Sequence, residues 1–118
     1  MPVSLNHLNL VVSDLDAAEA FFQAAFGFEP RAKHAALTVL DGQDGFTLVL
    51  MRSRNGRPVY PAGFHIGFLV DDEPAVDAEY RRLGHEGVTI PNPPKHMRGT
   101  YGFYFTALDE ILFEVSAR

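Results

Sequence analysis

Two histidines stand at equivalent points of two similar stretches of the sequence. Residues 6–14 read NHLNLVVSD and residues 64–72 read FHIGFLVDD, so His7 matches His65 at an offset of 58 positions. Both stretches are rich in apolar and β-branched residues, which is typical of strands with at least one buried face. The repetition of a histidine at the same point of two similar strands predicts that both side chains have the same functional role.

The last strand of each repeat supplies the next candidate ligand. The segments FTLVLMRS and ILFEVSAR are expected to correspond, and a register that follows the apolar pattern pairs Leu48 with Glu114. Four equivalent inward positions then hold His7, His65, Leu48 and Glu114, and all but the leucine can bind a metal. Two neutral imidazoles and one carboxylate bind a divalent first-row metal on one side and leave positions open for water or substrate. We therefore predict one divalent ion per site (Fe, Mn, Ni, Zn or Co), able to polarise a substrate oxygen or activate water.

Four further residues are candidates for the same pocket. Tyr104 precedes Glu114 by ten positions on the neighbouring strand of a hairpin, and this even spacing favours one face for both side chains. A phenol there could donate a hydrogen bond to an oxyanion, although an aromatic packed in the sheet is the structural alternative. Asn9 shares the face of His7. Lys95 and Arg98, in the segment PNPPKHMRG, could attract an anionic substrate or simply be solvated.

The surrounding pattern predicts two modules that each run strand, helix and then a group of strands. Ser13 or Asp14 can cap a first helix that Gly27 ends, and a proline follows the acidic cap of a second helix that ends at Gly84. Turn-forming residues between the halves indicate a linker. We expect a single domain with module one at about 1–53, the linker at about 54–62 and module two at about 63–118. The other expected strands are residues 35–40, 45–51, 87–90, 100–107 and 110–117.

Composition limits the function classes. The 118 residues carry a formal net charge of −5 and no basic run, which argues against nucleic acid as a partner. Cysteine is absent, so a disulfide framework and a thiolate metal site are both excluded. No apolar run reaches the length of a membrane span and the start lacks the pattern of a signal peptide, so a cytoplasmic location with no membrane partner is expected.

The stretches HLNLVVSDLDAAEAFFQAAFGF, FHIGFLV and ILFEV resemble the vicinal oxygen chelate superfamily. It includes glyoxalase I, extradiol dioxygenases, fosfomycin-modifying thiol transferases and bleomycin-resistance proteins. The resemblance implies an α+β fold in which two βαβββ modules form a curled mixed sheet around a central cavity that contains the metal. It places the metal ligands at His7, His65 and Glu114. The fourth position, a carboxylate in glyoxalase I, falls on Leu48, so the ligand set looks like that of the dioxygenases and thiol transferases.

The expected function is that of a metal-dependent lyase, dioxygenase or transferase acting on a small oxygen-rich molecule, with Tyr104 as a catalytic residue. The resemblance also implies a homodimer, because modules of this superfamily complete their cavities against one another. The alternative is a metal-free binding protein for a drug-like small molecule, of the bleomycin-resistance type. A third alternative is a structural domain, in which each buried histidine would need a protein hydrogen-bond partner.

Overall fold

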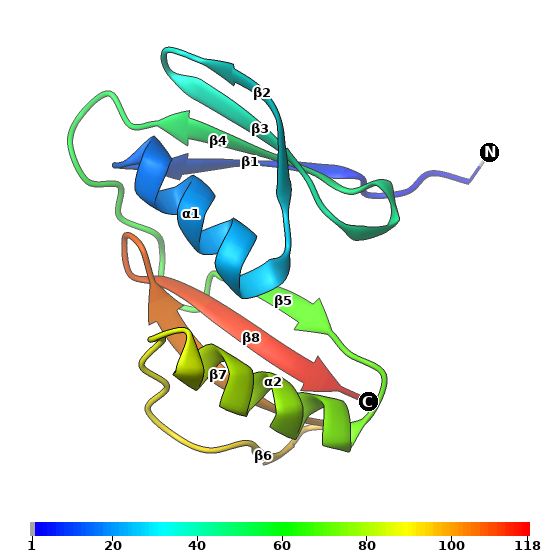
Figure 1. Cartoon of the computed structure of the whole chain (residues 1–118). Coiled ribbons are helices and arrows are strands. Elements are labelled where there is room, and N and C mark those ends of the chain that lie inside the picture. Colours follow the sequence, from blue (N-terminus) through cyan, green and yellow to red (C-terminus); the bar gives the residue numbers. More distant parts are fainter. Residues whose placement is uncertain (1) are drawn as a thin grey trace. The chain divides into compact units, whose positions relative to one another are not determined.

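Each half of the chain forms a four-stranded sheet with one helix packed against it (Figure 1). The computed structural model describes residues 2–118, and the chain separates into two compact units, residues 1–59 and 60–118. The first unit contains β1 (His7–Val12), α1 (Leu15–Phe26), β2 (Glu29–His34), β3 (Leu37–Asp41), a short 3₁₀ helix (Gln43–Gly45) and β4 (Thr47–Arg52). The second contains β5 (His65–Leu69), α2 (Glu73–His85), β6 (Lys95–Met97), β7 (Thr100–Ala107) and β8 (Ile111–Ala117).

The two sheets have the same topology. Their strand orders are β1-β4-β3-β2 and β5-β8-β7-β6. In each sheet the first strand is parallel to the last, and the remaining pairs are antiparallel. Two mixed four-stranded sheets with one helix each confirm the α+β class and the repeated βαβββ module.

The helix starts follow the predicted capping chemistry. The side chain of Asp14 accepts a hydrogen bond from the backbone N–H of Ala17 at 3.0 Å, and Asp72 does the same for Ala75. Gly27 ends α1 at a φ of 69°, a left-handed conformation that favours glycine. The predicted end of the second helix at Gly84 is wrong, because α2 continues through that glycine to His85. A glycine inside a helix costs only about 1 kcal/mol, which tertiary packing offsets.

Two edge strands differ from the prediction. The segment EPRAKH forms β2, although it lacks apolar alternation, and its side chains are mostly exposed. The strand expected at residues 87–90 is wrong, since the chain there is irregular and the pairing with β7 falls on Lys95–Met97. Edge strands are held on one side only, so backbone pairing rather than side-chain burial selects them.

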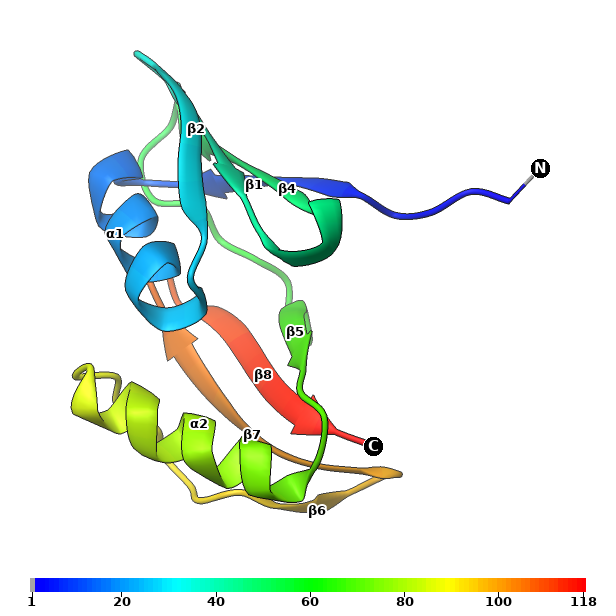
Figure 2. The ribbon, with the colours of Figure 1, turned by 45° about the vertical axis from the view of Figure 1, so that its right-hand side comes forward.

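One face of each sheet packs against the helix of its own unit and forms the core. Phe22 and Ala18 of α1 are buried with Leu48 and Leu50 of β4 in the first unit. Val76 and Leu83 of α2 are buried with apolar side chains of β7 and β8, against which the helix lies in Figure 2. We call the opposite side of each sheet its helix-free face. It carries His7, Asn9, Thr47, Val49, Asp41 and Val39 in the first unit, and His65, Gly67, Tyr104, Glu114, Leu112 and Thr106 in the second.

Neither helix in the described part of the chain is long and apolar enough to cross a membrane.

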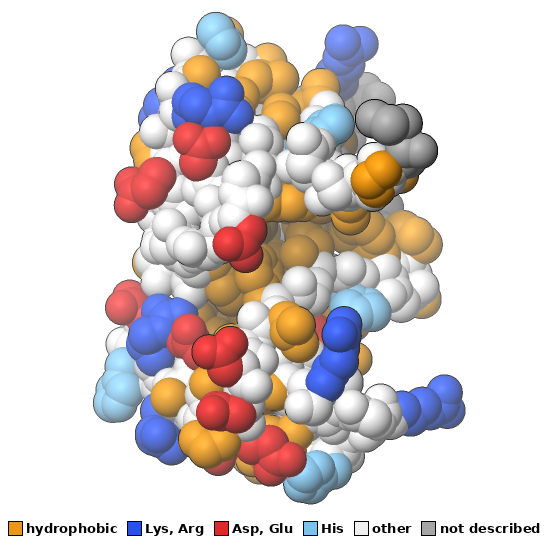
Figure 3. All heavy atoms as spheres, turned by 90° about the vertical axis from the view of Figure 1, so that its right-hand side faces the viewer, with side chains coloured by type: hydrophobic (Ala, Val, Ile, Leu, Met, Phe, Trp, Pro, Cys, Tyr) orange, Lys and Arg blue, Asp and Glu red, His pale blue; other side chains and the backbone are white. Residues whose placement is uncertain are grey.

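On the face shown in Figure 3, side chains of Lys and Arg are interspersed with those of Asp and Glu.

Candidate metal centre

His65 and Glu114 meet on the helix-free face of the second unit. His65 begins β5, and the parallel neighbour β8 places Glu114 beside Gly67, two residues further along. The imidazole Nε2 lies 3.2 Å from the Glu114 Oε1, and the two side chains are 40% and 15% exposed. The structure therefore brings these two candidate ligands together.

The backbone fixes which nitrogen of His65 faces the carboxylate. The Nδ1–H of His65 donates to the carbonyl oxygen of Gly63 at 3.0 Å. A carbonyl can only accept, so Nδ1 carries the proton and the neutral ring presents the lone pair of Nε2 to Glu114. Two acceptors that face each other at this distance repel, and they need either a proton or a cation between them. A histidine whose other nitrogen donates to a backbone carbonyl is the usual arrangement at metal sites.

The spacing of the pair also fits a shared ion. Nitrogen and oxygen ligands each at about 2.1 Å from a divalent metal are separated by about 3.0 Å at a right angle and about 3.4 Å at the tetrahedral angle. The observed 3.2 Å between Nε2 and Oε1 falls within this interval. The residues present therefore fit a divalent ion by donor type, tautomer and spacing.

Tyr104 lies beside both groups. It stands directly opposite Glu114 in the antiparallel pairing of β7 and β8, and its ring meets the His65 ring edge to face at a centroid distance of 5.8 Å. Burial, the negative charge of Glu114 and a hydrogen bond to that carboxylate raise the pKa of Tyr104 above its ordinary value. The phenol thus keeps its proton at neutral pH and acts as a hydrogen-bond donor.

His7 has the same local chemistry in the first unit. It is the first residue of β1, as His65 is of β5, and its Nδ1 lies 2.8 Å from the side-chain Oδ1 of Asn6. Because an amide oxygen only accepts, the neutral His7 ring also presents an Nε2 lone pair. The described residues, 2–118, include no group of three His, Cys, Asp or Glu side chains placed to hold a metal.

The predicted register of Leu48 is wrong. In the pairing of β1 with β4, Asn9 stands beside Val49, just as Gly67 stands beside Glu114 in the second unit. Val49 is therefore the equivalent of Glu114, whereas Leu48 points to the other side of the sheet and is only 2% exposed. Successive residues of a strand face opposite sides, so the one-residue difference moves Leu48 from the helix-free face into the core. Leu48 lines no substrate site.

The other predicted residues are placed as follows. The Asn9 amide donates to the Met51 sulfur at 3.4 Å on the helix-free face of the first unit. Lys95 on β6 is paired with Gly102 and so shares the helix-free face of the second unit, while Arg98 lies exposed in the turn between β6 and β7. His96 points to the opposite face, where its ring packs on the Tyr101 ring at a centroid distance of 4.9 Å. The remaining histidines, His34 and His85, are exposed.

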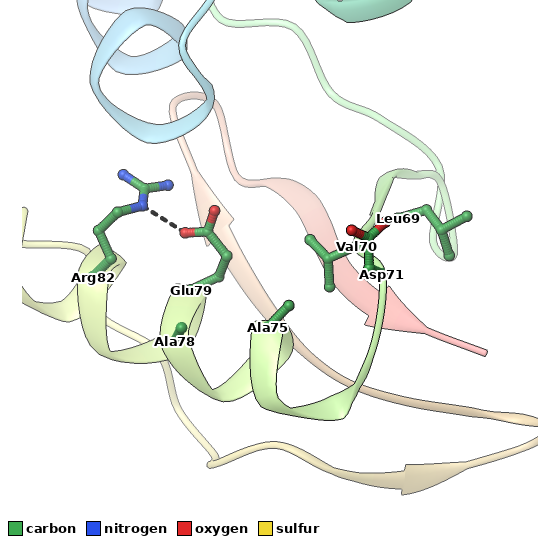
Figure 4. A pocket seen from close by; sticks show the side chains of 7 residues that line it. All are labelled: Leu69, Val70, Asp71, Ala75, Ala78, Glu79 and Arg82. Atoms are coloured by element: carbon green, nitrogen blue, oxygen red, sulfur yellow. Dashed lines mark hydrogen bonds and ion pairs between the residues drawn. The ribbon is translucent and has the colours of Figure 1, made fainter.

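A cavity of about 490 Å³ in the second unit lies away from these groups (Figure 4). Its lining comes from α2, the last residue of β5 and the segment between them, and it contains an ion pair between Glu79 and Arg82. None of the residues predicted to bind metal or substrate lines it.

Three positions escaped the sequence prediction. Gly63 orients His65 through its backbone, for which no side-chain signal exists. Asn6 precedes His7 directly, and an amide next to a candidate ligand is a signal for a supporting hydrogen bond. Val49 would have emerged from an ungapped alignment of FTLVLMRS with ILFEVSAR.

Comparison with known proteins assigns the chain to a family. The sequence profile of the Glyoxalase/Bleomycin resistance protein/Dioxygenase superfamily matches residues 4–115, nearly the whole chain. The protein belongs to this superfamily. No protein among those with curated functions matches the chain.

Solved structures of the superfamily share its fold. A possible glyoxalase from Bacillus cereus is 36% identical, with a TM-score of 0.84, and the match covers 97% of this chain and 98% of the other. The fosfomycin resistance protein FosX from Listeria monocytogenes is 25% identical, with a TM-score of 0.83 and coverage of 100% and 95%. In its complex with Mn(II) and sulfate, FosX is 26% identical to this chain, with a TM-score of 0.76 and coverage of 99% and 91%.

Proposed function

We propose that this superfamily member is a metal-dependent enzyme that acts on a small oxygen-rich molecule, with His7, His65 and Glu114 as the ligands of one divalent ion. The contact between His65 and Glu114 carries this proposal, because the imidazole Nε2 and a carboxylate oxygen face each other at 3.2 Å. The matching tautomer of His7 supports its role as the third ligand. The Mn(II) complex of FosX supports a divalent ion in this fold.

The ion and the residues around it have distinct roles in this proposal. The ion, when bound, supplies a Lewis acid that polarises substrate oxygens. Gly63 and Asn6 hold the two imidazoles in the tautomer that can bind it. The raised pKa of Tyr104 keeps its phenol protonated, and its single O–H, which donates to Glu114 in the free chain, is the proposed donor to negative charge that develops on the substrate. Asn9 and Lys95, on the helix-free faces, are the proposed substrate contacts, together with Arg98 in the adjacent turn.

Elemental analysis of protein purified without a polyhistidine tag tests the proposal. The wild type is expected to bind one divalent ion per chain. His65→Ala and Glu114→Gln should each weaken binding by more than the roughly 10- to 100-fold that loss of a supporting residue costs. His85→Ala is the matched control, since His85 is an exposed histidine at the end of α2, and it should bind metal as the wild type does.

Circular dichroism distinguishes loss of a ligand from loss of the fold. Unchanged stoichiometry in folded His65→Ala protein would contradict the ligand assignment. A wild type without affinity for any divalent ion would favour the metal-free binding protein instead.

A further inference from the structure

Arg31 is held on the helix-free face of the first unit by two side chains. Its Nε donates to the Oδ1 of Asp41 at 2.8 Å, and its Nη2 donates to the Oγ1 of Thr47 at 3.2 Å. The register of β2 and β3 shifts between Pro30 and Ala32, which makes Arg31 the extra residue of a β-bulge. Bulges redirect a side chain and are frequent next to active sites. Here the bulged residue reaches across β3 to a side chain of β4.

The two contacts occupy one edge of the guanidinium and leave the other open. Arginine has five N–H donors, and the edge formed by Nε and Nη2 is used by Asp41 and Thr47. The edge formed by Nη1 and the second hydrogen of Nη2 can bind a carboxylate or phosphate through two parallel hydrogen bonds. The Arg31 side chain remains 54% exposed, so a ligand can reach it.

The position of Arg31 relates it to the proposed ligand His7. His7 stands beside Thr47 in the pairing of β1 and β4, and Thr47 stands beside Asp41 in the pairing of β4 and β3. His7 and the two residues that hold Arg31 thus form one row across the sheet. Neighbouring strands are about 4.8 Å apart, so the backbone positions of Thr47 and Asp41, whose side chains hold the guanidinium, lie roughly 5–10 Å from that of His7.

We infer that Arg31 binds an oxyanion group of the substrate, a carboxylate, phosphate or phosphonate, and thereby selects anionic molecules. This inference deepens the proposed function and rests on it, because the substrate must lie at His7. An exposed ion pair contributes little stability, so the pair with Asp41 is weak evidence of a structural role. Its effect is to orient the guanidinium before a ligand arrives, which lowers the entropy lost on binding.

Calorimetric titration with inorganic phosphate and with acetate tests the inference on the metal-free protein. Whichever anion the wild type binds more tightly should bind about 10- to 100-fold more weakly to Arg31→Met, the range expected for hydrogen bonds to a charged group. Arg31→Lys should restore only part of the affinity, because an ammonium keeps the charge but lacks the two-donor edge. Arg54→Met is the matched control, as Arg54 is an exposed arginine of the same unit, and it should leave the affinity unchanged.

Titration of the Mn(II)-loaded protein separates this inference from the proposed function. Equal anion affinity of the wild type and Arg31→Met in the metal-free protein overturns the inference, whatever the metal does. Full affinity in Arg31→Lys overturns the two-donor contact. If Mn(II) does not bind, the proposed function fails, and the metal-free titration still decides whether Arg31 binds anions.

Discussion

A pair of glutamate substitutions on adjacent residues of β4 tests the register that defines the helix-free face of the first unit. Leu48→Glu places a carboxylate in the core, because Leu48 is 2% exposed. Val49→Glu places it at the equivalent of Glu114, beside Asn9. The two variants gain the same charge on the same strand and differ in the face on which the new side chain lies.

The two substitutions are expected to lower the free energy of unfolding by amounts that differ severalfold. Leu48→Glu loses about 1.5–3 kcal/mol of side-chain burial, and an unpaired buried charge adds several kcal/mol more. A total of about 5 kcal/mol matches the entire stability of many small domains, so this variant should unfold or nearly so. Val49 is only partly buried, and a glutamate there can keep its carboxylate in water, so Val49→Glu should cost about 1 kcal/mol.

Thermal denaturation with and without a divalent metal measures both effects. At this chain length, 1 kcal/mol corresponds to a Tm change of about 4 °C. Val49→Glu supplies an additional carboxylate, so metal should raise its Tm by more than it raises that of the wild type. A metal concentration of about 100 times the Kd stabilises the folded state by about 2.7 kcal/mol.

The reasoning is refuted if Leu48→Glu is as stable as Val49→Glu, or if metal rescues Leu48→Glu but leaves Val49→Glu unchanged. Val49→Gln is the control, because it has a similar size and polarity without the negative charge of the ligand. Its Tm should show no greater response to metal than the wild type.

Three further predictions concern the ligands and Tyr104. If the protein is a homodimer that forms each site from His7 of one chain and His65 of its partner, mixing His7→Ala with His65→Ala protein should rebuild one intact site per heterodimer; a monomer in solution scattering would exclude this arrangement. Asn6→Ala should weaken metal binding about 10- to 100-fold in equilibrium dialysis, because His7 loses the acceptor that fixes its tautomer, and unchanged affinity would count against His7 as a ligand. The folded chain holds the Tyr104 proton more tightly than the unfolded chain, and this difference stabilises the folded state. The stabilisation is complete below the ordinary pKa of 10.0 and is lost as the pH rises through the raised pKa. Tyr104→Phe should therefore lose less stability above pH 10 than the wild type in denaturant titrations, and an identical pH dependence would contradict the shift.

Local patterns were sufficient to predict the repeated module and one side of the candidate metal centre. Asp14 and Gly27 mark the ends of α1 through chemistry that involves only neighbouring residues. The even spacing of Tyr104 and Glu114 around a short turn fixed their common face, because hairpin strands pair close to the turn. The equivalence of His7 and His65 followed from the repeat and holds in the structure, where each begins the first strand of its unit.

Tertiary structure decided the features that depend on pairing between distant strands. The segment Leu48, Val49, Leu50 is apolar at every position, so its sequence has no alternation from which a face can be read. The parallel pairing with β1 decides that Val49 and not Leu48 corresponds to Glu114 and lies on the helix-free face. The bulge that directs Arg31 toward Thr47 is also invisible in the polar segment EPRAKH. In both strands the backbone pairing sets the direction of each side chain, and a shift of one residue reverses it.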